Sequence, residues 1–146
     1  MTGIHVGLGA ALLAANLAAG LYGAWAWLRW SNAPGFWPLL RAGQVLVAAQ
    51  ALLGGGLVIA GREPPDLHLV YGLTPLLVAF LAEQLKLLSA QAELDHAGLE
   101  DAQAVGRLPA AEQHLLVAAI VRREIGVMAA SALVVSVLAA RAAQWL

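Results

Sequence analysis

Four long runs of apolar residues, separated by short polar or proline-containing breaks, dominate the pattern along the chain. Each run has the roughly 20 residues that a helix needs to cross the hydrocarbon core of a bilayer. Helix is the expected structure, because it satisfies its own backbone hydrogen bonds in lipid. We predict an all-α, integral membrane four-helix bundle that forms one domain over residues 1–146. Its helices are expected at about 4–30, 36–60, 65–104 and 109–145.

The breaks predict the topology. Residues 31–35 and 61–65 hold proline and glycine, and both connections are short. Short connections make neighbouring helices antiparallel, which predicts an up-down-up-down bundle. Pro75 lies inside the third run, where we expect a kink or a local repair of the backbone hydrogen bonds.

The stretch from about 85 to 124 is much more charged than the rest, yet its leucines still recur at helical spacing. We interpret it as extensions of the third and fourth helices into the cytoplasm, forming a hairpin over about 89–122. The hairpin would turn near Gly106 and Arg107, with Pro109 opening the return helix. The alternative is a flexible loop that carries one interfacial helix.

Composition supports the membrane prediction. Hydrophobic residues make up 61% of the chain and charged residues 12%, whereas a soluble domain has about 45–50% and about 25%. The chain has no cysteine, which excludes disulfides, thiolate metal sites and cysteine nucleophiles. A net charge of −1 argues against a nucleic-acid partner.

Lysine and arginine predict the orientation. With four spans, six of the eight basic residues fall on one side, which the positive-inside rule makes cytoplasmic. Arg62 and Arg141 fall on the other side, together with both termini. Four tryptophans form an expected aromatic belt at the cytoplasmic interface, namely Trp25, Trp27, Trp30 and Trp37. We therefore expect a multi-pass protein of the inner (plasma) membrane with both termini outside.

Two histidines are the most informative polar residues. His5 opens the first helix and His68 opens the third, so both imidazoles are expected at similar depth near the outer face. Gly9 and Gly72 follow them at the i+4 position, which lies on the same helix face. This pattern leaves clearance for a porphyrin between two axial histidines, and four-helix bundles often build cofactor sites in this way.

Simpler interpretations exist for the same residues. His5 lies near a chain end and can be solvated, and His68 can be an ordinary interfacial residue. His96 and His114 are expected at the surface of the charged segment. Glu83 is expected to pair with Arg41 at the cytoplasmic end.

Small and polar residues inside the spans are expected to serve packing. Gly7, Ala11, Ala15, Ala19 and Gly23 recur at spacing four in the first helix and predict a close helix contact. Gly54, Gly55 and Gly56 allow either close packing or room for a flat ligand. The polar side chains in the apolar spans are expected to join helices or to touch a ligand: Asn16, Gln44 and Gln50.

The segment from Gln50 to Gly55, a short outer loop and then His68 at the next helix start resembles a half-repeat of the haem A synthase family. Ile4 and His5, which open a helix rich in small residues, resemble the start of the other ligand helix. The resemblance implies a four-helix unit that holds haem between histidines on two helices. The sequence departs from the catalytic half of that family, because Thr2 replaces its glutamate and no cysteine pair is present.

These observations predict a membrane-bound protein that binds b-type haem for one-electron transfer or haem handling, and not for substrate turnover. His5 and His68 are the expected iron ligands, and Arg62 is expected to pair with a propionate. The expected cofactor-binding residues are His5, Gly9, Gln50, Gly54, Arg62, His68 and Gly72. The alternative is a cofactor-free accessory subunit of a larger, respiratory-type membrane complex. The partners expected are the lipid bilayer and either another membrane protein or further copies of the chain.

Overall fold

The computed structural model describes residues 2–65 and 67–143, and every regular element among them is an α-helix. The four long helices are α1 (Thr2–Arg29), α2 (Phe36–Ile59), α3 (His68–His96) and α5 (Ala110–Ala142). A single turn, α4 (Ala102–Val105), lies between α3 and α5. All four long helices are long and apolar enough to cross a bilayer, which supports a multi-pass membrane protein. The all-α prediction is thereby confirmed for the described residues.

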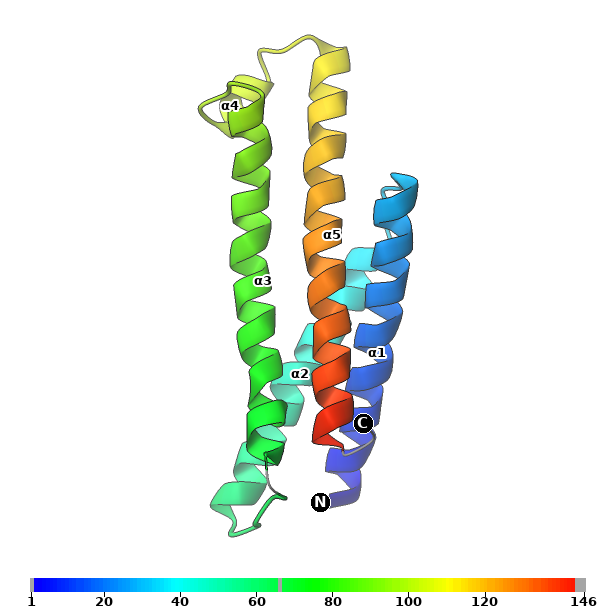
Figure 1. The fold of residues 1–146 in the computed structure, drawn as a ribbon, viewed down its shortest axis with the longest axis vertical. Coiled ribbons are helices and arrows are strands. Elements are labelled where there is room, and N and C mark those ends of the chain that lie inside the picture. Colours follow the sequence, from blue (N-terminus) through cyan, green and yellow to red (C-terminus); the bar gives the residue numbers. More distant parts are fainter. Residues whose placement is uncertain (1, 66, 144–146) are drawn as a thin grey trace.

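Helix α5 is the centre of the packing (Figure 1). It contacts α1 and α3 along much of their length, and α1 also packs on α2, whereas α2 and α3 touch only sparsely. The start of α1 and the end of α5 lie at one end of the molecule, with the loop between α2 and α3 (Figure 1). We call this the terminal end. The opposite end, which holds α4, is the α4 end, where α3 and α5 reach beyond α1 (Figure 1).

The tightest part of the core joins α1, α2 and α5. Phe36, Leu40, Ile125 and Met128 are the largest apolar side chains that are fully buried there. Gly23 makes this packing possible, because a Cβ atom at that position would lie 2.4 Å from Cε2 of Phe36. Close approach through small residues is therefore what fits α1 to its neighbours.

The predicted small-residue stripe of α1 is only partly a helix contact. Ala19 and Gly23 are buried, but Gly7 and Ala11 are exposed. The buried face of α1 instead runs through Leu12, Asn16, Ala19, Gly20, Gly23 and Ala26. This face mixes spacings of three and four, because a helix turns every 3.6 residues and a strict four-residue repeat drifts away from its partner.

The helix bounds differ from the predicted ones at α3. The helix ends at His96 and not at 104, because Gly98 adopts a left-handed backbone with φ of 69°. The Leu99 amide donates to the Leu94 carbonyl at 3.0 Å, and the Gly98 amide donates to that of Asp95 at 3.0 Å. This pair of bonds is the glycine-based Schellman stop. Helix α5 begins at Ala110, beside the predicted start, and the predicted end at 145 lies outside the described residues.

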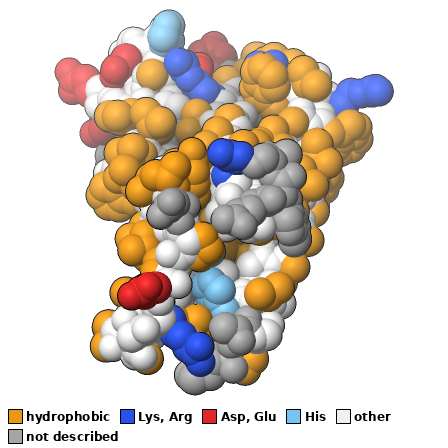
Figure 2. All heavy atoms as spheres, turned by 60° about the horizontal axis from the view of Figure 1, so that its bottom comes forward, with side chains coloured by type: hydrophobic (Ala, Val, Ile, Leu, Met, Phe, Trp, Pro, Cys, Tyr) orange, Lys and Arg blue, Asp and Glu red, His pale blue; other side chains and the backbone are white. Residues whose placement is uncertain are grey.

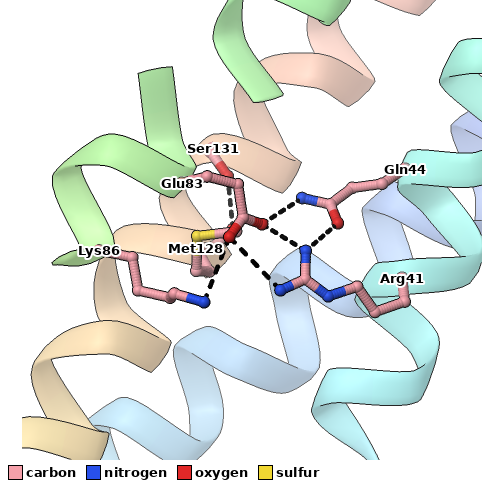
Figure 3. Close-up of polar contacts among 6 residues, drawn as sticks. All are labelled: Arg41, Gln44, Glu83, Lys86, Met128 and Ser131. Carbon is pink, nitrogen blue, oxygen red and sulfur yellow. Dashed lines mark hydrogen bonds and ion pairs between the residues drawn. The ribbon is translucent and has the colours of Figure 1, made fainter. Parts of the chain in front are cut away.

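A polar cluster ties α2 to α3 where they otherwise touch little (Figure 3). The Glu83 carboxylate pairs with the Arg41 guanidinium, accepts a hydrogen bond from Gln44 Nε2 at 2.9 Å and lies 3.2 Å from Lys86 Nζ. The predicted pairing of Glu83 with Arg41 is confirmed. Gln44 also joins two helices as predicted.

Basic side chains cover the tryptophans beside this cluster. The Arg122 guanidinium lies 4.0 Å from the ring centroid of Trp30 and 5.1 Å from that of Trp27, and Lys86 Nζ lies 5.5 Å from the Trp37 ring. Such cation–π contacts contribute about 0.5–1 kcal/mol each at exposed sites. The Arg122 contacts join the end of α1 to α5, and the Lys86 contact joins α3 to α2.

Candidate functional site

A cavity of about 570 Å³ lies at the terminal end of the bundle, and all four long helices contribute to its wall. Figure 2 shows this end, with a histidine set back in a hollow beside basic and acidic side chains. Its volume falls within the ~300–1,000 Å³ typical of small-molecule sites. The structure brings all seven predicted cofactor-binding residues to this wall: His5, Gly9, Gln50, Gly54, Arg62, His68 and Gly72.

The imidazole rings of His5 and His68 lie next to each other at the wall of the cavity. His5 comes from the first turns of α1 and His68 is the first residue of α3. Their ring centroids lie 5.9 Å apart, with an angle of 55° between the ring planes. Both side chains are half-buried. The two imidazoles therefore lie at a similar level along the bundle, as expected.

His68 is held by the end of α5. Its Nδ1 atom lies 2.8 Å from the carbonyl oxygen of Ala142. A carbonyl oxygen only accepts hydrogen bonds, so Nδ1 carries the proton and donates it. The Nε2 atom is then left with a free lone pair, which is the form in which histidine binds a metal. Metal-binding histidines commonly donate their other ring nitrogen to such an acceptor.

His5 is held differently, by α2. Gln50 Nε2 lies 3.3 Å from His5 Nε2 and donates to it. The proton of His5 therefore sits on Nδ1. Gln50 joins α2 to α1 through this bond, in the way that polar side chains do inside membrane bundles.

Glycines shape the space around the histidines. A Cβ atom at Gly54 would lie 3.2 Å from Cε1 of His5, and one at Gly9 would lie 3.1 Å from Nε2 of Gln50. A Cβ atom at Gly72 would meet nothing within 4 Å. Gly9 and Gly54 thus make room for the two polar side chains, and Gly72 borders open cavity.

Among the described lining residues, the charged side chains lie at the mouth of the cavity. Arg62 and Glu63 line it in the loop after α2, while most other lining residues are apolar. Arg62 is placed there by the stop of α2, where Gly61 has φ of 80° and the Arg62 amide donates to the Leu57 carbonyl at 3.0 Å. The cavity therefore has a mostly apolar wall, with one basic and one acidic side chain at its mouth.

The remaining polar residues highlighted by the sequence lie elsewhere. His96 and His114 are exposed residues outside the cavity lining. Asn16 does not join two helices as expected, because its Nδ2 atom donates to the Leu12 carbonyl of its own helix at 2.9 Å. Its amide group packs against Gly43 of α2.

A bis-histidine haem can be tested against this geometry. Such a haem would need two imidazoles from different helices beside one apolar cavity. His5 of α1 and His68 of α3, with ring centroids 5.9 Å apart at the cavity wall, supply such a pair. No group of three or more His, Cys, Asp or Glu side chains is placed to hold a bare metal ion in the described part of the chain. Two histidines would be enough for a haem iron, because the porphyrin supplies the other four nitrogens.

Two contacts at this end were not anticipated from the sequence. The Ala142 carbonyl that orients His68 is a backbone group, which no side-chain pattern reveals. The Arg141 guanidinium lies 5.5 Å from the ring centroid of Tyr71 and links α5 to α3 beside the cavity. The contact between Arg141 and Tyr71 could have been predicted from the sequence, because an arginine and a tyrosine occur near the ends of adjacent helices.

Comparisons with known proteins assign no function to the chain. No protein-family model, no curated protein and no solved structure matches the chain. The cavity, its two histidines and its charged mouth are therefore the basis for the function proposed below.

Proposed function

We propose that the protein is a membrane cytochrome-like protein that holds one b-type haem between His5 and His68. The observation that carries the proposal is the approach of these two imidazoles, from different helices, to 5.9 Å at the wall of a large apolar cavity. The chain has no cysteine for thioether attachment, so the haem would be bound without covalent bonds to its vinyl groups.

The residues of the cavity have separate roles in this proposal. His5 and His68 hold the iron, and Arg62 at the mouth binds a propionate by a charge-assisted hydrogen bond. The apolar wall excludes water and Gly72 leaves space for the ring. Bound haem supplies one-electron oxidation and reduction. The function is electron transfer or haem handling, and the resemblance to haem A synthase points in the same direction.

The proposal is tested by spectroscopy of protein expressed with ample haem. The wild type is expected to show the Soret and visible bands of a low-spin haem with two histidine ligands. His5→Ala and His68→Ala should each convert the spectrum to a high-spin form or abolish it. His96→Ala and His114→Ala are matched controls at the α4 end and should change nothing. A protein without a Soret band, or a low-spin spectrum that survives both cavity variants, would refute the proposal.

We also propose an up-down-up-down arrangement with the terminal end outside the cell and the α3–α5 hairpin in the cytoplasm. Six of eight basic residues, which include Arg41 and Arg122 of the α4 end, support this orientation in the inner membrane. Because the chain has no cysteine, single cysteines report sidedness cleanly. Arg62→Cys should react with an impermeant thiol reagent in intact cells, and Arg107→Cys only after lysis. The reverse result would overturn the orientation.

A second candidate function is that of a cofactor-free subunit in a larger membrane assembly. One observation favours it: Gly7 and Gly56 are exposed, and a Cβ atom at either position would meet nothing within 4 Å. Such glycines allow another helix to approach closely in lipid. Gly7→Leu should release a stable partner or dissociate an oligomer in mild detergent. An unchanged monomeric mass before and after the substitution would exclude this role.

A further inference from the structure

The hydrogen bonds of His5 and Gln50 are incomplete. Gln50 Nε2 donates to His5 Nε2, which leaves the proton of His5 on Nδ1. Neither His5 Nδ1 nor Gln50 Oε1, both buried atoms, has a hydrogen-bond partner among the described residues. A buried donor and a buried acceptor are therefore both unpaired, although their side chains are in contact. Buried polar groups are normally paired, so this exception calls for a physical cause.

His68 shows what the completed arrangement looks like. Its Nδ1 donates to the Ala142 carbonyl, and its Nε2 keeps a free lone pair. His5 has the same tautomer, but its Nε2 is occupied by Gln50. One histidine is thus already set to bind a metal, whereas the other is not.

We infer that Gln50 is the positioning residue of His5 and that its side chain exchanges one hydrogen bond for another when the cavity is filled. This inference rests on the proposed haem function. The bond from Gln50 Nε2 to His5 Nε2 would break, and His5 Nδ1 would donate to Gln50 Oε1 instead. The exchange frees Nε2 of His5 as a ligand and gives both unpaired atoms a partner.

The surroundings permit this exchange. The exchange requires the Gln50 amide and the His5 ring both to turn, and the terminal torsions of glutamine and histidine are broad, so these rotations require little energy. Gly9 leaves room beside the amide of Gln50, and Gly54 leaves room beside the His5 ring, as the short distances to a built Cβ atom indicate. Both movements are rotations of side chains that are already in contact.

The exchange has an electronic consequence that distinguishes it from simple packing. An acceptor on Nδ1–H raises the basicity of the imidazole, and a more basic axial ligand favours ferric over ferrous iron. Loss of the Gln50 acceptor should therefore weaken haem binding and also raise the reduction potential. A residue that only filled space would not be expected to move the potential in this direction.

Three variants of the full-length protein test the inference. Gln50→Leu removes the acceptor, Gln50→Glu keeps an acceptor oxygen, and Gln44→Leu removes a glutamine of the same helix that does not line the cavity. Each is titrated with haemin in detergent and then titrated redox-potentiometrically, with circular dichroism to verify the helix content.

We expect Gln50→Leu to bind haem about 10–100-fold more weakly and to have a more positive potential. Gln50→Glu should bind as the wild type does, with a potential at or below that of the wild type, and Gln44→Leu should change neither quantity. If Gln50→Leu does not fold, the potential of Gln50→Glu decides, and a more positive value overturns the inference. If Gln50→Leu has the haem affinity and the reduction potential of the wild type, the inference about Gln50 is overturned and the proposed haem function is not affected. A wild type that binds no haem overturns the proposed function and the exchange with it.

Discussion

Filling the cavity from Gly72 should have opposite effects on stability and on haem binding. A Cβ atom at Gly72 meets nothing within 4 Å, and the residue lines the cavity within α3. Gly72→Leu therefore fits the ligand-free protein and removes a flexible glycine from a helix, which stabilises it by about 0.5–1 kcal/mol. The new side chain takes on the order of 100–150 Å³, about a fifth to a quarter of the 570 Å³ cavity.

A ligand that needs the whole cavity must then overpack it. Overpacking costs about 1–3 kcal/mol, which corresponds to roughly 5–150-fold weaker haem binding. Haemin titration gives the affinity, and thermal unfolding of the ligand-free protein gives the stability. Gly56→Leu is the matched control, because Gly56 also borders open space but does not line the cavity. It should gain the same stability and keep full affinity. Equal haem affinity in both variants would refute the assignment of the cavity.

Two further substitutions test the packing that supports the site. Glu83→Gln should lower the unfolding free energy by about 0.5–1 kcal/mol, because it removes the negative charge that pairs with both Arg41 and Lys86. The control variant Glu100→Gln should leave the unfolding free energy unchanged. Equal unfolding midpoints for the two variants in a detergent denaturation series would contradict this prediction. Gly23→Ala should cost about 1–3 kcal/mol, since its Cβ atom would lie 2.4 Å from Phe36 Cε2. Gly7→Ala on the same helix should be tolerated, and similar losses in both would show that the α1 contact is wrongly placed.

The sequence predicted the helices well because lipid imposes a simple rule. A run of about 20 apolar residues has few alternatives to a helix, so four runs predicted the four long helices that the structure contains. The end of α3 was predicted eight residues too late, at 104, because Leu99 continued the helical period beyond His96. Gly98 carried the missing signal, since a left-handed residue followed by an apolar one is typical of a helix stop.

The arrangement of the cavity was predictable only in part. His5 and His68 were expected at one depth because both open helices that start on the same side, and their rings do meet. The hydrogen bond from His68 to the Ala142 carbonyl could not be predicted from the sequence. Every residue has a carbonyl, and only the packing of α5 against α3 brings this one to His68. The contact between Gln50 and His5 depends on how α2 rotates against α1, which the sequence pattern does not determine.

The most direct test of the proposed function is a stoichiometric titration of the purified protein with haemin. The geometry predicts a low-spin spectrum that saturates at one haem per chain, because one pair of histidines faces one cavity. The double variant of His5→Ala with His68→Ala should show no saturable low-spin binding, whereas the double variant of His96→Ala with His114→Ala should titrate as the wild type does. Absence of a saturation point in the wild type, or the same end point in the His5 and His68 double variant, would contradict the proposed function.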